Sequence, residues 1–312
     1  MKEAGIETRL VYGFLDAGKT SYIQDCIQND FFYKHGTTLI LCFEQGEAAY
    51  DEEALAKRNT SVEYHDGEED VTVFCLRCIE AFRPDRIYVE MNSMMQDLRT
   101  QLPDCMQAAF SVTWIDWKTL PLYFVNFTQM INQMVSASQQ VVFRGCPSKE
   151  QLEPYSQAFR LMNQKASYLR QDPMGYHEKA FDLYLPFSLE DKEIIVTKDR
   201  FVPLWLDALD HPEHYEGKIL HITDPLELRQ SEANGLWRAG RVVMACCMAD
   251  LQFMAFEIAA DGLPGGWAVF DAIAQSGRDK YGQRKLILKP DAVRSVSAPS
   301  PSIIDLRSIG SQ

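Results

Sequence analysis

The stretch from Gly13 to Thr20 constrains this chain more than any other feature, because it fits the pattern Gly-x-x-x-x-Gly-Lys-Thr. An apolar run of strand type, residues 8–14, leads into it, and a helical pattern, residues 19–32, follows it. In such a strand–loop–helix unit, the glycines permit tight turns that aim successive backbone N–H groups at phosphate oxygens. The positive end of the helix points at the same place. The sequence therefore predicts a loop that binds the phosphates of a nucleotide.

The residue types in this loop suggest separate tasks. We expect Lys19 to offer a cation to the β- and γ-phosphates and the Thr20 hydroxyl to bind Mg²⁺. The predicted nucleotide-binding residues are Gly13, Asp16, Ala17, Gly18, Lys19, Thr20 and Ser21. Asp16 is unusual here, because a negative charge close to a triphosphate repels it. We therefore expect the Asp16 side chain to face solvent or the water shell of the metal ion.

The first half of the chain alternates strand and helix patterns. Strand-type runs fall at residues 8–14, 37–44, 85–91, 110–117 and 139–145, and helical patterns fall at residues 19–32, 71–82 and 122–138. This alternation predicts an α/β fold, in which a mostly parallel sheet carries helices on both faces. In such folds ligands bind at the carboxyl ends of the strands.

The character of the sequence changes after about residue 170. Residues 170–182 are polar and contain helix breakers, so we interpret them as a linker. A short helical stretch at residues 200–209 and several strand-type runs follow, which predicts a smaller, β-rich, barrel-like domain. The predicted domains are residues 1–172 and 180–298, with a mobile Ser/Pro-rich tail at residues 299–312.

Composition excludes some classes of protein. The formal net charge of −13 argues against a nucleic-acid-binding protein, which needs a basic face for phosphates. No run approaches the roughly 18–20 apolar residues that a membrane span needs, so we expect no direct membrane insertion. No signal peptide is visible, and most of the eight cysteines lie in apolar runs, as reduced core cysteines do. These features predict a cytoplasmic protein.

Four motifs, in the same order along the chain, resemble those of the CobW family of P-loop GTPases. They are "GFLDAGKTSYI" at residues 13–23, "FEQGEAAYD" at 43–51, "VEMNSM" at 89–94 and "FRLMNQKASYL" at 159–169. The likeness spans roughly residues 8–170. This family is related to the hydrogenase- and urease-maturation GTPases and is associated with metal delivery, so the resemblance implies a P-loop GTPase domain that acts in metal handling.

The resemblance also implies roles for acidic residues. Glu90 takes the place of the acid that holds the Mg²⁺ shell or orients the attacking water, so Lys19 and Glu90 are the predicted catalytic residues. Glu44, Glu47 and Asp51 would belong to a switch segment that responds to the γ-phosphate. The residues lead to the same expectation for Glu90, since an acid directly after an apolar strand in a P-loop fold is the expected Mg²⁺ partner.

The chain departs from the family where guanine is recognised. An Asn-Lys-x-Asp motif should follow the strand at residues 139–145, but Arg144, Gly145, Cys146 and Pro147 stand there. Pro147 has no acceptor side chain for the N1 and N2 hydrogens of guanine. The sequence therefore leaves open whether the cofactor is Mg²⁺ with GTP, Mg²⁺ with ATP, or no nucleotide.

Two cysteine pairs are candidates for a metal. Cys75 and Cys78 lie near the position of a family metal motif, yet Val71, Phe74, Cys75, Cys78, Ile79 and Phe82 form one apolar helix face. We favour a core role for this pair, because a lone Cys-x-x-Cys is a weak zinc signal.

The second pair lies in the C-terminal half. "DRFVPLWLDALDHPEHYEGKILHI" and "GRVVMACCMAD" resemble the C-terminal domain of a soluble subunit of a putative two-component permease. Cys246, Cys247 and Asp250 are recurring residues there, and one cysteine could bind zinc with Asp250 or with His211, His214 or His221. The alternative is that one cysteine is a core residue and the other packs under a loop.

Taken together, these patterns predict Mg²⁺-dependent binding and hydrolysis of a nucleotide in metal homeostasis, as a metallochaperone or a permease accessory. The expected partners are a nucleotide and either a membrane permease or a metal-receiving protein. Two alternatives stay open. One is an adaptor whose P-loop fold has lost catalysis, and the other is a metal-binding regulator that uses the C-terminal domain.

Overall fold

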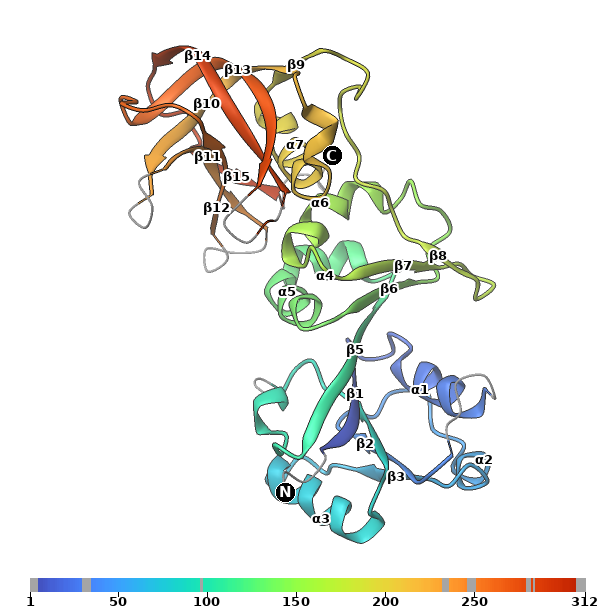
Figure 1. Cartoon of the computed structure of the whole chain (residues 1–312). Helices are drawn as coiled ribbons and strands as arrows, with labels where there is room; N and C mark the ends of the chain where they lie inside the picture. The colour runs from blue at the N-terminus through green and yellow to red at the C-terminus, as the bar shows by residue number, and fades with distance from the viewer. Residues whose placement is uncertain are drawn as a thin grey trace. The chain divides into compact units, whose positions relative to one another are not determined.

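The computed structural model describes residues 5–29, 35–95, 98–231, 236–245, 251–278, 282 and 284–306. The chain divides into two compact units (Figure 1). The first unit comprises Met1–Gln151 and Asn163–Phe181, and the second comprises Leu152–Met162 and Asp182–Gln312.

The first unit is built on an eight-stranded sheet with the order β3-β2-β4-β1-β5-β6-β7-β8. The strands are β1 (Ile6–Gly13), β2 (Thr38–Cys42), β3 (Thr60–Tyr64), β4 (Arg86–Glu90), β5 (Met106–Asp116), β6 (Gln140–Arg144), β7 (Ser167–Gln171) and β8 (His177–Lys179). All neighbours pair in parallel except β7 and β8. The predicted α/β class with a mostly parallel sheet is confirmed.

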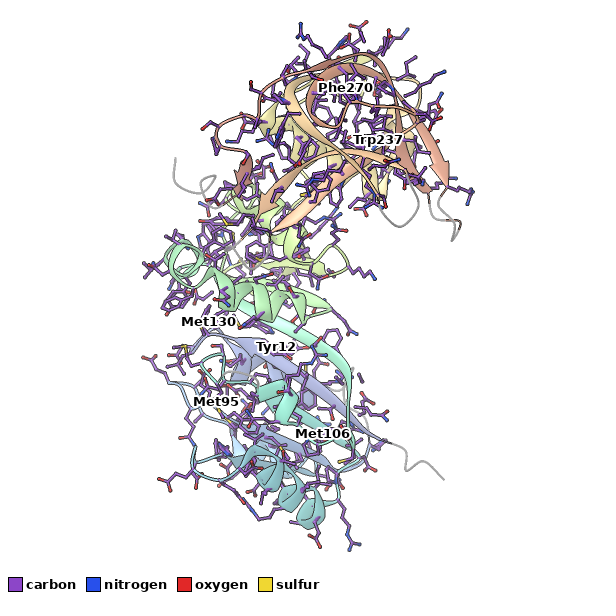
Figure 2. All side chains as sticks on the ribbon, turned by 90° about the vertical axis from the view of Figure 1, so that its left-hand side faces the viewer. Tyr12, Met95, Met106, Met130, Trp237 and Phe270 are labelled. Carbon is purple, nitrogen blue, oxygen red and sulfur yellow. The ribbon has the colours of Figure 1, made fainter. Side chains whose placement is uncertain are left out.

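Burial explains the parallel arrangement. Every residue of β2 and β4 is buried, as expected for central strands whose two faces are both covered. The helices of this unit are α1 (Lys19–Gln28), α2 (Glu52–Ala56), α3 (Val71–Phe82), η1 (Leu98–Gln101), α4 (Leu120–Asn126) and α5 (Thr128–Ser136). Ile23 of α1 and Ile40 of β2 are fully buried in one core cluster with Trp114 of β5. Tyr12, labelled in Figure 2, is also buried.

Two sequence predictions for this unit need correction, and two short elements were missed. The helix predicted at residues 122–138 is two helices, because Phe127 leaves the helical conformation at φ −128° and ψ 30°. The short elements α2 and β3 were not predicted. The predicted linker at residues 170–182 is in fact a hairpin, in which β8 pairs antiparallel with β7. Its breakers, Asp172–Gly175, make the turn, and Arg170 donates to Glu178 across the two strands at 2.9 and 2.6 Å.

The second unit contains a seven-stranded sheet with the order β15-β11-β12-β14-β13-β10-β9. A further pairing of β10 with β11 closes β10, β11, β12, β14 and β13 into a barrel, so the predicted smaller β-rich unit is confirmed. The elements are α6 (Glu153–Met162), β9 (Glu193–Val196), α7 (Lys198–Asp210), η2 (Pro212–Tyr215), β10 (Ile219–Gln230), β11 (Trp237–Met244), β12 (Gln252–Ile258), β13 (Gly266–Arg278), β14 (Arg284–Ser295) and β15 (Ile303–Asp305). Phe270, labelled in Figure 2, belongs to the buried side chains of this unit.

The C-terminal segment differs from the predicted mobile tail. Ile303–Asp305 form β15, which pairs in parallel with β11. The buried guanidinium of Arg241, on β11, donates to the carbonyl oxygens of Pro301 at 3.1 Å and Ser302 at 3.2 Å. Composition could not reveal this attachment, because it depends on a strand and a buried arginine that lie about 60 residues away in sequence.

Within the described residues, no helix combines the length and the apolar character that a membrane crossing requires.

Candidate functional site

The Gly-rich loop occupies the carboxyl end of β1. Strand β1 ends at Gly13 and α1 begins at Lys19, as the sequence pattern predicted. Gly18 has a φ of 104°, and a Cβ atom there would approach Cδ of Arg144 to 2.9 Å. A Cβ atom on Gly13 would lie 2.5 Å from the carbonyl oxygen of Trp114 on β5. Both positions therefore favour glycine, because φ is positive at each, 149° at Gly13 and 104° at Gly18, and because a Cβ atom at either would meet a close neighbour.

Lys19 is buried at the start of α1, with 3% of its surface exposed. Its ammonium group donates to the carbonyl oxygens of Gly13 at 3.0 Å and Phe14 at 2.9 Å. It also forms an ion pair with the carboxylate of Glu44, whose side chain is 9% exposed. The lysine is thus held inside the loop by three oxygen atoms, one of which carries a negative charge from the segment after β2.

Thr20 and Glu90 meet beside this lysine. Strand β4 lies next to β1, with Glu90 opposite Val11, so Glu90 ends its strand within reach of α1. The Thr20 hydroxyl donates to Oε1 of Glu90 at 2.9 Å, and the Tyr50 hydroxyl donates to Oε2 at 2.5 Å. Only 3% of Glu90 is exposed, and this burial raises the pKa of its carboxyl group. A hydroxyl oxygen and a carboxylate oxygen at this place are ligands that Mg²⁺ prefers.

The segment after β2 contacts the loop at a second point. Oδ1 of Asp16 accepts a hydrogen bond from the backbone N–H of Glu47 at 2.9 Å. Asp16 has a φ of 59° and is exposed, so its side chain leaves the loop toward this segment. Asp51 starts the next helix, where Oδ1 accepts from the N–H of Ala54 at 3.0 Å. Of the predicted switch residues, Glu44 and the backbone of Glu47 thus contact the loop, whereas Asp51 caps α2.

A cavity opens between this segment and the loop. It has a volume of about 280 Å³, and its lining includes Thr20, Glu44, Gly46 and Tyr50. Tyr50 was not predicted as a site residue. The sequence contained no local sign of its role, because the partner of its hydroxyl is 40 residues away.

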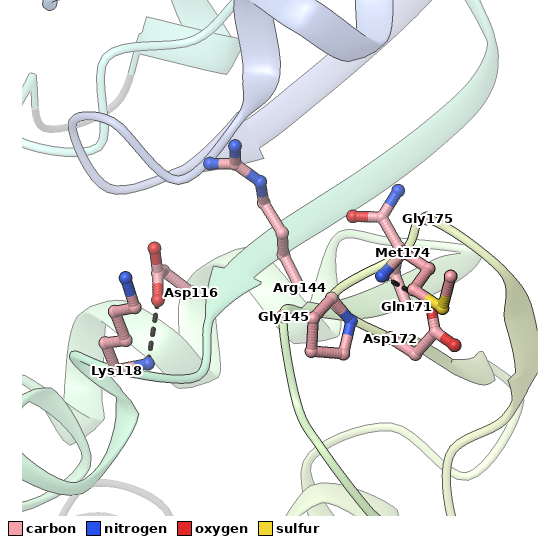
Figure 3. A pocket seen from close by; sticks show the side chains of 9 residues that line it. Asp116, Lys118, Arg144, Gly145, Gln171, Asp172, Met174 and Gly175 are labelled. Atoms are coloured by element: carbon pink, nitrogen blue, oxygen red, sulfur yellow. Dashed lines mark hydrogen bonds between the residues drawn. The ribbon is translucent and has the colours of Figure 1, made fainter.

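A second cavity, of about 560 Å³, lies on the other side of the loop (Figure 3). It is lined by Asp116, Lys118, Arg144, Gly145, Gln171, Asp172, Pro173, Met174 and Gly175. Arg144 extends from the end of β6 toward the loop, and its guanidinium donates to the carbonyl oxygen of Asp16 at 3.3 Å. This is the place where the expected Asn-Lys-x-Asp motif is absent, and polar and charged residues border an open cavity there.

The remaining predicted residues are placed as follows. Ala17 is buried within the loop, and Ser21 is exposed in the first turn of α1. Cys75 and Cys78 are fully buried on the inner face of α3, where burial raises the pKa of their thiols to about 12 and about 11. Their burial agrees with a core role. Cys246, Cys247 and Asp250 lie outside the described residues.

The three histidines of the second unit have carboxylate neighbours. Nδ1 of His214 lies 2.9 Å from Oδ2 of Asp207, and Nδ1 of His221 lies 2.8 Å from Oδ1 of Asp271. The ring of His211 stacks on that of His214, with centroids 4.8 Å apart. Among the residues that the structure describes, no group of three or more His, Cys, Asp or Glu side chains is arranged to hold a metal ion.

No protein-family model and no curated protein matches the chain. Among solved structures, it is similar to the hydrogenase maturation factor HypB from Archaeoglobus fulgidus (14% identity, 55% of this chain, 83% of that chain, TM-score 0.40). It is also similar to HypB from Helicobacter pylori in complex with nickel (10%, 54%, 79%, 0.36) and to Zn(II)-bound YjiA GTPase from E. coli (15%, 86%, 94%, 0.35). At identities and TM-scores this low, the roles of the site residues rest on the geometry of this chain alone.

Proposed function

We propose that the first unit binds a nucleoside triphosphate with Mg²⁺ at the Gly13–Ser21 loop and hydrolyses it. The observation that supports this most directly is the 2.9 Å contact between the Thr20 hydroxyl and Glu90, beside the buried ammonium group of Lys19. All three groups lie where β1 and β4 end and α1 begins, so a cation, a helix N-terminus and a pair of oxygen ligands converge.

Each residue has a defined task in this proposal. Lys19 and the backbone N–H groups at the start of α1 stabilise the negative charge of the phosphates. Thr20 and Glu90 would hold Mg²⁺, which neutralises charge that develops on the phosphate oxygens during transfer. The Tyr50 hydroxyl fixes the second oxygen of Glu90 and keeps this carboxylate turned toward Thr20. The Glu44 carboxylate must move away from Lys19 before a phosphate can contact this lysine. The conformation of the segment that carries Glu44 therefore depends on whether the site is occupied.

The wider role that we propose is metal handling, as a metallochaperone or a permease accessory. It is supported by the motifs at residues 43–51 and 89–94 and by the resemblance of the C-terminal half, in which Cys246 or Cys247 would bind zinc with Asp250. A second candidate is an adaptor that binds nucleotide without turnover. The pairing of Lys19 with Glu44 favours it, because this contact competes with phosphate.

Isothermal titration with GTP and ATP, each with and without Mg²⁺, tests nucleotide binding. We expect binding that Mg²⁺ strengthens, and a loss of at least about a hundredfold, or 2.8 kcal/mol, in Lys19→Ala. Lys165→Ala is the matched control, because this exposed lysine lies just ahead of β7, at the amino ends of the strands and so away from the loop. If Lys19→Ala binds as the natural protein does, the proposed site is wrong. Phosphate release by the purified chain then separates the hydrolase from the adaptor.

A further inference from the structure

The cavity beside Arg144 combines charges of both signs. Asp116 and Asp172 bring carboxylates to its lining, while Lys118 and Arg144 bring cations. Figure 3 shows Arg144 between the two aspartates, with its guanidinium directed at the phosphate loop. A ligand that has its phosphates on the loop and its other end in this cavity therefore passes the guanidinium of Arg144.

The sheet order distinguishes the two carboxylates. Asp116 ends β5, the strand next to β1, whereas Asp172 follows β7, three strands from β1. At about 4.8 Å between neighbouring strands, Asp172 lies about 14 Å from the end of β1 measured along the sheet. Asp116 lies only about 5 Å from it by the same measure. Asp172 is therefore the aspartate whose carboxylate can reach the base, at the far end of a nucleotide.

Asp172 is also held rigidly. Its Oδ1 accepts hydrogen bonds from the backbone N–H of Met174 at 2.8 Å and of Tyr176 at 2.9 Å. Its own N–H donates to the carbonyl oxygen of Tyr176 at 3.0 Å, and Gly175 completes the turn with a φ of 92°. One carboxylate oxygen is thus used to shape the β7–β8 turn, and Oδ2 supplies the remaining acceptor capacity at the cavity.

From these observations we infer that Asp172 reads the base of the nucleotide and that this base is guanine. The inference rests on the proposed nucleotide site and adds its specificity. Guanine presents N–H groups at N1 and N2, from which the two lone pairs of Oδ2 can accept, and acceptors at O6 and N7, which suit Arg144 or Lys118. Adenine presents a lone pair at N1, which a carboxylate repels. The β7–β8 turn thereby supplies the acceptor that Pro147 lacks.

A substitution that exchanges guanine preference for xanthine preference tests this assignment, because it should raise the affinity for XTP while it lowers the affinity for GTP. Xanthine carries a carbonyl group at C2 in place of the guanine amino group, so it needs a donor where guanine needs an acceptor. Asp172→Asn provides that donor, and asparagine forms the same kind of turn as aspartate, which protects the fold. Asp116→Asn, the same charge change on the same cavity, is the matched control. Titrations would use GTP, ATP and XTP with each protein in the presence of Mg²⁺.

The natural chain should bind GTP at least tenfold more tightly than ATP. Asp172→Asn should lose about ten- to a hundredfold in GTP affinity and gain at least tenfold for XTP, in line with a hydrogen bond to a charged group. Asp116→Asn should keep the GTP preference. Equal binding of GTP and ATP by the natural chain, or a base exchange caused by Asp116→Asn instead, would overturn the assignment to Asp172. If Lys19→Ala also leaves nucleotide binding unchanged, the proposed site fails as a whole.

Discussion

The ion pair between Lys19 and Glu44 should oppose nucleotide binding, and Glu44→Gln should strengthen it. The pair is almost fully enclosed, with exposed side-chain fractions of 2% and 9%, so solvent screens it little. A hydrogen bond to a charged group contributes about 1.5–3 kcal/mol. If phosphate must displace the Glu44 carboxylate, a variant without this charge no longer loses that free energy when the nucleotide binds. At 1.4 kcal/mol per factor of ten, affinity should rise about ten- to a hundredfold.

The same substitution should destabilise the free protein by a similar amount, because the buried ammonium group of Lys19 then has only neutral oxygen atoms as partners, among them the carbonyl oxygens of Gly13 and Phe14. Isothermal titration with Mg²⁺ and GTP measures the gain in affinity, and urea unfolding without nucleotide measures the loss in stability. Glu47→Gln is the control, since its exposed side chain lies in the same segment and only its backbone N–H contacts the loop. Unchanged or weaker GTP binding by Glu44→Gln would refute the competition between carboxylate and phosphate.

Four further predictions concern other contacts. Burial raises the pKa of the Glu90 carboxyl group above its ordinary value of 4.5, so the folded chain binds this proton more tightly than the unfolded chain does. As pH rises from 4.5 toward 7, the free energy of unfolding of the natural protein in urea titrations should therefore fall relative to that of Glu90→Gln. A difference between the two proteins that does not change with pH would contradict this. Asp16→Gly should speed hydrogen exchange at the backbone amide of Glu47, because this N–H loses its acceptor. A gain above about a hundredfold in nucleotide affinity would instead show that the Asp16 carboxylate repels the phosphates. Half-buried Cys105 should react with a thiol reagent well before buried Cys75 and Cys78, because burial raises the pKa of their thiols to about 12 and about 11. Labelling of the native protein at pH 8, followed by peptide mass spectrometry, measures these rates, and equal rates would contradict the burial of Cys75 and Cys78. Arg241→Met should destabilise the barrel unit by at least about 2 kcal/mol in urea, because it removes the buried donors to the carbonyl oxygens of Pro225, Pro301 and Ser302, whereas Arg238→Met on the exposed side of the same strand should not.

The parts of the site that could be predicted from sequence are local. The strand, loop and helix around Lys19 form one continuous stretch, and the glycine, lysine and threonine positions follow from its pattern. Glu90 could be predicted because an apolar strand that ends in an acid indicates the carboxyl edge of the sheet. Helix α3 was predicted at its observed bounds, since its apolar face repeats at helical spacing.

The parts that could not be predicted depend on long-range contacts. Glu44 reaches Lys19 across 25 residues, and Arg144 reaches Asp16 across 128. The polar turn at Asp172 has the composition of a linker, and only its pairing with β7 makes it part of the sheet. Likewise, residues 301–305 are attached to β11 by strand pairing and by Arg241, partners that composition cannot indicate.

The sequence by itself determined that this chain has a Gly-rich loop of the phosphate-binding pattern at the end of a buried strand, because the order of residue types within a dozen consecutive positions suffices for that feature. Only the tertiary structure decided what surrounds the loop. The order of the strands places Glu90 and Tyr50 on one side and Arg144 and Asp172 on the other, and strand order follows from the packing of the whole sheet. The missing guanine motif looked like a gap in the sequence. In the folded chain it borders an open cavity, where a carboxylate from the next strand is available.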